Sequence, residues 1–135
     1  MFKLIESMYQ DPIRLPLKPG LKLTAGHVVK FAEYNGDVVI DLCDGYSPIG
    51  LLGNRCCGGN VVDFTKRSRA LVYPQRMIAD IGKFDRRNEV KVGDSLYCNA
   101  RGVLSSKRPF ENAYVLAKVI SIPSTEKKYM QILWL

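Results

Sequence analysis

The last third of the chain alternates short apolar runs with turn-forming residues, and this pattern constrains the fold more than any other. Gly93-Asp94 and Asn99–Gly102 are turn sequences, and they bracket a strand predicted over Ser95–Cys98. Two longer strands are predicted over 113–122 and 129–134. The pattern indicates antiparallel strands, and none of its residue types marks a reaction centre.

Strand signals continue in the middle of the chain. Asn35-Gly36 is the strongest short hairpin signal, and it joins strands predicted over 28–33 and 37–42. A third strand is predicted over 47–52, where Gly50 indicates a bulge or the close approach of another backbone. About seven to nine short strands with no helical period predict an all-β fold. With 135 residues the chain is expected to form one domain, a small antiparallel β-barrel or β-sandwich.

The N-terminal segment differs from the rest in its closely spaced prolines. Proline blocks helix propagation and cannot serve a central strand, so residues 11–20 are predicted to be extended. This segment is expected either to pack as a strand on its own domain or to reach a neighbouring protein. We divide the chain into an extended N-terminal arm (1–22) and a β-barrel or sandwich domain (23–135). The chain without residues 1–20 is then expected to fold.

Four cysteines are present, and none of them forms a C-x-x-C pair. Cys56 and Cys57 are adjacent, which does not suit the usual zinc loop, and His27 is the only histidine. Cys43 and Cys98 are interpreted as small buried hydrophobic residues of strands. We therefore expect neither a metal nor a cofactor.

The residues that catalysis commonly needs form no recognisable pattern. His27 has no nucleophile or carboxylate pattern around it, and the spacing of Asp41 and Asp44 is that of a hairpin turn. Cys56 follows Arg55, which can lower a thiol pKa, but no histidine lies near it in the sequence. We expect a protein that is not an enzyme. Neither a cleavable signal nor a membrane span is recognisable, so the protein is expected to begin in the cytosol.

The net charge of +7 favours an acidic partner, either a nucleic acid or an acidic protein surface. Aromatic residues lie beside basic ones at Lys30-Phe31, Lys83-Phe84 and Arg67–Tyr73, as in β-barrels that bind single strands. About one aromatic residue per strand is also what an ordinary β core contains. A single-stranded nucleic-acid-binding barrel is therefore the alternative from another functional class, and nucleic acid is not the partner we favour.

Three short motifs follow one another in the sequence. Leu23–Val29 reads LTAGHVV, and Gly45–Leu52 reads GYSPIGLL. Tyr97–Leu104 reads Y-x-N-x-x-G-x-L and is followed by Arg108-Pro109 and an apolar final strand. In this order the motifs resemble small structural proteins of tailed bacteriophages that decorate or cement the capsid. The resemblance covers residues 23–135 in outline.

The resemblance implies a non-enzymatic virion protein, a capsid decoration (cement) protein that binds across coat subunits and stabilises the head. Its partner would be the major capsid protein or another virion structural protein, and its location the virion, assembled in the host cytoplasm. A tail, fibre-anchoring or head–tail joining component is the alternative among virion proteins, since one fold serves many places.

The strand predicted over 113–122 is largely apolar on both faces from Tyr114 to Ile122, which is typical of a central strand or of a subunit interface. We therefore expect a homo-oligomer, a dimer or trimer, with Tyr114 and Leu116 in self-assembly. The apolar tip of the N-terminal segment is expected to contact the partner. The expected protein-interface residues are Phe2, Leu4, Ile5, Met8, Tyr9, Tyr114 and Leu116.

Overall fold

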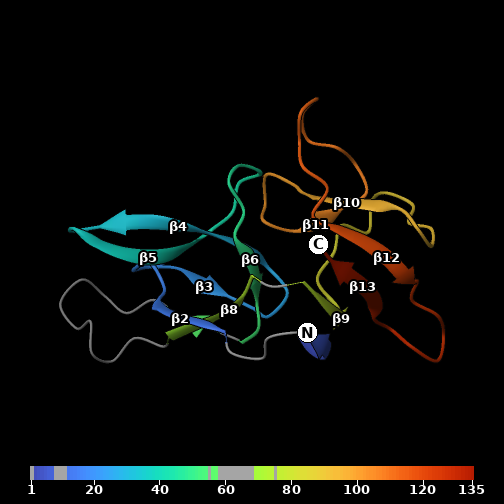
Figure 1. Cartoon of the computed structure of the whole chain (residues 1–135), viewed down its shortest axis with the longest axis horizontal. Helices are drawn as coiled ribbons and strands as arrows, with labels where there is room; N and C mark the ends of the chain where they lie inside the picture. Colours follow the sequence, from blue (N-terminus) through green and yellow to red (C-terminus); the bar gives the residue numbers. More distant parts are fainter. Residues whose placement is uncertain (1, 8–11, 55, 58–68, 75) are drawn as a thin grey trace.

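The computed structural model describes residues 2–7, 12–54, 56–57, 69–74 and 76–135. These residues form two antiparallel sheets, one strongly curled into half a barrel, and a short two-stranded ribbon (Figure 1). The predicted all-β fold is confirmed. No helix among the described residues is long and apolar enough to cross a membrane.

The six-stranded sheet contains the C-terminal strands and the N-terminal strand. In spatial order its members are β1 (Phe2–Ser7), β9 (Met77–Ile81), β13 (Met130–Trp134), β12 (Ala117–Ser121), β10 (Ser95–Cys98) and β11 (Leu104–Ser105). Alternation places Met130, Ile132 and Trp134 of β13 in the core, because successive strand side chains point to opposite faces. The strand predicted over 113–122 is shorter in the structure, since pairing begins only at Ala117.

The five-stranded sheet is built from the first half of the chain and β8. Its spatial order is β2 (Ile13–Pro16), β8 (Arg69–Tyr73), β6 (Gly50–Leu52), β4 (Val28–Tyr34) and β5 (Asp37–Leu42). The sheet curls until its two outer strands meet, where Leu17 bridges Ile40 and the Lys18 amide donates to the Ile40 carbonyl at 2.8 Å. The ribbon pairs β3 (Lys22–Leu23) with β7 (Cys56–Cys57).

Two glycine-containing positions confirm the turn chemistry read from the sequence. Asn35 and Gly36 both have positive φ, 49° and 83°, which is the backbone of a tight hairpin between β4 and β5. At Gly50 another backbone approaches closely, because a Cβ there would lie 2.6 Å from the carbonyl oxygen of Tyr73. Only glycine lets β6 and β8 pack at this distance.

The two sheets enclose two apolar cores. One lies inside the curled five-stranded sheet and contains Leu17, Val29 and Ile40. The other is covered by the six-stranded sheet and also takes Val28 and Leu51 from the opposite face of the first sheet. Strands β4 and β6 therefore contribute to both cores, and they hold the two halves of the chain together.

The N-terminal segment is built into these sheets. β1 pairs with β9, and β2 pairs with β8 along the edge of the five-stranded sheet. The Phe2 ring packs on Tyr73, with ring centroids 5.1 Å apart, and Leu17 is fully buried. Of the two alternatives for residues 1–22, the described part shows packing on its own domain rather than an arm that extends away from it.

Candidate functional site

A pocket of about 240 Å³ opens between two loops at the end of the six-stranded sheet. One wall is the loop after β5, with Gly45, Tyr46 and Pro48, and the other is the segment before β12, with Phe110 and Tyr114. The lining side chains are mainly apolar and aromatic. Such a pocket suits an apolar side chain of a partner, since large apolar groups gain most from removal from water.

The loop after β5 is held in a tight turn. Gly45 and Ser47 adopt positive φ, 106° and 54°, and the Asp44 carboxylate accepts the Tyr46 amide at 3.3 Å. Lys30 Nζ lies 3.4 Å from the same carboxylate. The Tyr46 amide, together with Lys30, lowers the pKa of Asp44. This geometry projects the Tyr46 side chain outward, with 61% of its surface exposed.

The rings of Tyr46 and Phe110 stack across the mouth of the pocket. Their centroids are 4.8 Å apart and their planes differ by 9°. Tyr114 stands on the same side as Phe110 and is 84% exposed. Exposed aromatic residues around a preformed pocket are typical of the centre of a protein interface.

The segment that carries Phe110 and Tyr114 is anchored at both ends. Arg108 donates to the Tyr97 hydroxyl and to the Glu111 carbonyl, each at 3.1 Å. Beyond Tyr114, the Leu116 amide donates to the Leu96 carbonyl at 2.9 Å, and the Leu116 side chain packs against the core. The aromatic wall is therefore fixed before any partner arrives.

Two buried thiols lie beneath the pocket. Cys98 lines it, and Cys43 Sγ donates to the Tyr46 carbonyl at 3.3 Å. Contact between the two thiols lowers the pKa of Cys43, whereas the same contact and burial raise the pKa of Cys98. Both cysteines are free and buried, which confirms their interpretation as core residues.

Catalytic or metal-binding groups do not gather at the pocket. No His, Asp, Glu or Lys side chain is part of its lining as the described residues define it. Among all the residues that the structure describes, no group of three or more His, Cys, Asp or Glu side chains is placed to hold a metal ion. The arrangement can bind a side chain or a small apolar group by burial and stacking.

The predicted interface residues fall into separate places. Tyr114 and Leu116 belong to the pocket, whereas Phe2 and Leu4 pack against the core of their own chain. Ile5 lies on β1 with 45% of its surface exposed. The remaining two predicted residues, Met8 and Tyr9, lie outside the described residues.

Sequence reasoning did not single out the stacked pair of the pocket. Tyr46 and Phe110 are 64 positions apart in sequence, and only the meeting of two loops brings them together. A weak signal exists, because each aromatic residue follows a turn residue, Gly45 or Pro109, rather than lying within a strand. An aromatic residue in a turn has less access to the core than one in a strand.

The described parts of the basic–aromatic stretches proposed for nucleic acid lie on different elements of the fold. Lys30-Phe31 lies on β4, where Phe31 is 48% exposed and Lys30 faces Asp44. Lys83-Phe84 lies in the loop after β9, next to a separate hollow. Of the third stretch, residues 69–73 form β8, where the Tyr73 ring packs on Phe2, and residues 67–68 lie outside the described residues.

Comparison with known proteins adds no relative to this description. No family model matches the chain, and no curated protein matches its sequence.

Proposed function

We propose that the protein is a non-enzymatic structural protein of a tailed-bacteriophage virion, a capsid decoration protein that docks on the head through its aromatic pocket. The observation that carries the proposal is the preformed pocket between Tyr46, Phe110 and Tyr114. Tyr46 and Tyr114 are the most exposed aromatic side chains among the described residues, and they provide the contact surface that such a protein needs.

The place of the resembling motifs supports this reading. The GYSPIGLL motif at Gly45–Leu52 supplies one wall of the pocket, and Arg108-Pro109 begins the other wall. Part of the resemblance therefore falls on the pocket, whereas its first motif, Leu23–Val29, does not line it.

The magnitude of the contact is adequate for docking. A buried tyrosine removes roughly 150–250 Å² from water, so Tyr46 and Tyr114 would contribute several kcal/mol at about 25 cal/mol per Å². A stable interface buries about 1,600 Å² in total, so surfaces around the pocket would have to contribute to the contact as well. A second copy of the chain could add area around a symmetry axis, in line with the proposed homo-oligomer.

Co-sedimentation with expanded capsids tests the proposal. Purified chain is mixed with heads assembled from the major capsid protein encoded with it, and bound chain is measured in the pellet. We expect the wild type to pellet and Tyr114→Ala to remain in the supernatant, since the variant removes an exposed side chain and should leave the fold intact. Tyr129→Ala, at an exposed residue before β13, is the matched control.

Each alternative function predicts a different experimental result. Binding to purified tails but not to heads would favour a tail or head–tail joining component. A shift of the native mass on single-stranded DNA, with no capsid binding, would favour the nucleic-acid-binding barrel. Equal loss of binding in both tyrosine variants would place the contact outside the pocket and overturn the proposal.

A further inference from the structure

A second hollow, of about 460 Å³, lies beside the turn that precedes β11. Its walls carry the cationic side chains Lys83, Arg86, Arg87 and Arg101, and Asp85 is the one carboxylate in its described lining. Four cations against a single anion leave an excess of three positive charges in one concave site. Concave sites lined by one sign of charge concentrate ligands of the opposite sign.

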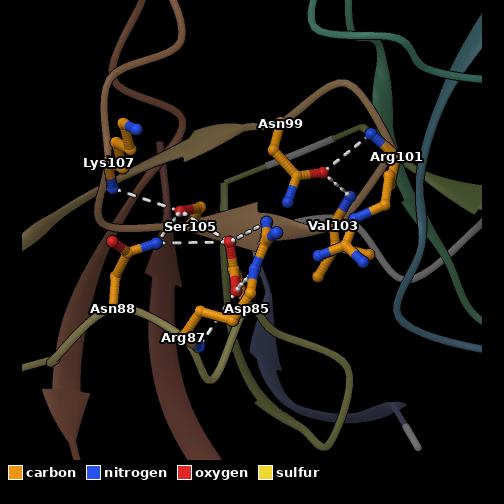
Figure 2. A network of polar contacts seen from close by, with 8 residues as sticks. All are labelled: Asp85, Arg87, Asn88, Asn99, Arg101, Val103, Ser105 and Lys107. Carbon is orange, nitrogen blue, oxygen red and sulfur yellow. Dashed lines mark hydrogen bonds and ion pairs between the residues drawn. The ribbon is translucent and has the colours of Figure 1, made fainter.

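The negative charge of Asp85 is paired with the positive charge of Arg87. Its carboxylate is buried and receives Arg87 Nε at 3.0 Å and Nη2 at 2.9 Å, in a two-pronged pair (Figure 2). The Arg87 amide and the Asn88 side chain donate to the same carboxylate at 3.0 and 3.2 Å. The Arg87 guanidinium holds the pKa of Asp85 well below its usual range, so this pair is neutral as a unit at ordinary pH.

The other three cations have no ion-pair partner among the described residues. No described carboxylate lies within ion-pair distance of Lys83, Arg86 or Arg101. Some described cations elsewhere, such as Lys22 and Lys128, also lack an ion pair, whereas others, such as Lys18 and Lys30, lie within 3.6 Å of an aspartate. The hollow is distinguished because three cations without an ion pair line one site.

The walls of the hollow are fixed in advance. The Asn99 side chain accepts the amides of Arg101 and Val103 at 2.9 and 3.1 Å, which closes the turn that carries Arg101 (Figure 2). On the other wall the Asp85 amide donates to the Leu104 carbonyl at 2.8 Å and ties the loop to β11. Because little ordering remains to be done on binding, a preorganised site of this kind loses less entropy.

The hollow offers poor support for nucleic-acid bases. The Arg86 guanidinium lies 4.3 Å from the centroid of the Phe84 ring, and Phe84 also packs against the core. The Phe84 ring is therefore already engaged by Arg86 and by the core, whereas single-strand binding depends on open aromatic faces. The site is suited to oxyanions that guanidinium groups can bind in pairs, and not to stacked bases.

We propose that this hollow binds an acidic segment of a partner protein through its carboxylates. The identity of that partner as a virion protein rests on the proposed function, but the carboxylate chemistry does not. Residues 98–103 contribute to both sites, Cys98 to the aromatic pocket and Arg101 to the hollow. An apolar anchor and an acidic segment of one partner could therefore engage neighbouring parts of the protein.

The titration of His27 can report whether an anion binds in the hollow. It is the only histidine, and its side chain lines the hollow, with Nδ1 3.0 Å from the Thr24 carbonyl oxygen. Burial, followed by the charge of Lys83, lowers the pKa of His27 below its ordinary value. An anion bound nearby favours the charged imidazolium, so its arrival raises that pKa.

The experiment titrates the full chain with decaglutamate, following affinity by calorimetry and the single histidine resonance by NMR. We expect binding that weakens with salt, a raised His27 pKa and no response to decaglutamine. Arg101→Glu should weaken binding at least about tenfold, and Arg86→Ala/Arg101→Ala should act in the same direction. Lys22→Ala/Lys128→Ala removes the same charge as the second variant from exposed positions that do not line the hollow, and it should change affinity less than about twofold.

Each other result overturns the proposal. If both double variants weakened decaglutamate binding equally, the binding would depend on the net charge of the protein and not on the hollow. Tighter binding of oligothymidine than of decaglutamate would assign the hollow to nucleic acid, and inorganic phosphate of equal affinity would make it a small-anion site. Because this assay uses no capsid, a negative result would not contradict the proposed role of the aromatic pocket. A negative result in the capsid assay would likewise not contradict the binding of an acidic peptide by the hollow.

Discussion

Tyr46 and Phe110 form a stacked aromatic pair across the aromatic pocket, with their ring planes 9° apart. Each ring belongs to a loop rather than to a strand, so the stack ties the loop after β5 to the segment before β12. The pair therefore has a role in the isolated protein as well as in the proposed contact. Its contribution can be measured without a partner.

A double-mutant cycle on this pair should show coupling. We expect Tyr46→Ala and Phe110→Ala each to lower the free energy of unfolding by about 1 kcal/mol, with a coupling of about 0.5–1.5 kcal/mol between them. Urea denaturation of the wild type, both single variants and the double variant gives the value. Tyr114→Ala, which removes an unstacked ring, should change stability by less than about 0.5 kcal/mol. Strict additivity of the two single variants would show that the stack contributes nothing.

Gly50 should resist any side chain. In Gly50→Ala the new methyl group would lie 2.6 Å from the Tyr73 carbonyl oxygen and 3.0 Å from the Pro74 Cα, both backbone atoms that cannot turn aside. We expect a loss of about 3 kcal/mol in unfolding free energy and a lower melting temperature. Gly20→Ala is the control, because its φ of +87° is unfavourable but nothing lies within 4 Å, so its loss should be only about 1 kcal/mol. A Gly50 variant as stable as the control would contradict the close approach of β6 and β8.

Asp85 should link stability to acid pH. Its pKa is lowered in the folded protein, chiefly by the Arg87 guanidinium. As the pH falls below about 4, the unfolded chain takes up the proton first, so the contribution of Asp85 is full above that pH and declines below it. We expect Asp85→Asn to be less stable than the wild type by about 2 kcal/mol at pH 7, with a gap that narrows below pH 4.

Urea unfolding of both proteins between pH 7 and pH 3 measures this gap. Asp37→Asn, at an exposed residue of β5, is the control and should follow the wild type throughout. A gap that stays constant across the range would show that the ionised carboxylate is not what Asp85 contributes.

The strands could be predicted because their signals are local. Asn35-Gly36 needs only its own backbone geometry to form a hairpin, and the alternation in β13 needs only one buried face. Gly50 was interpretable for the same reason, since a glycine within a strand indicates a neighbouring backbone. Where a pattern of a few residues determines the outcome, the sequence is sufficient.

The site depends on relationships that local patterns do not contain. Tyr46 meets Phe110 only after both sheets have formed, and the hollow joins Lys83 to Arg101 across two loops. The apolar pattern of residues 113–122 points to Tyr114, but it places this residue inside a strand. In the structure β12 begins only at Ala117, and Tyr114 lies in the segment before it. The N-terminal segment was ambiguous for a related reason, because proline content shows that it is extended without showing what it lies against.

The pairing of the N-terminal strands with β9 and β8 leads to a prediction different from the one made from the sequence, namely that the chain without residues 1–20 does not fold. The deletion would remove β1 and β2, each an edge strand with its backbone paired, together with the fully buried Leu17. We expect the truncated chain to lose cooperative unfolding, and Leu17→Ala in the full chain to cost about 2–5 kcal/mol. Ile5→Ala, at an exposed position of β1, should cost far less than Leu17→Ala. Circular dichroism during thermal unfolding measures all three, and a truncated chain as stable as the wild type would show that residues 1–20 are dispensable to the fold after all.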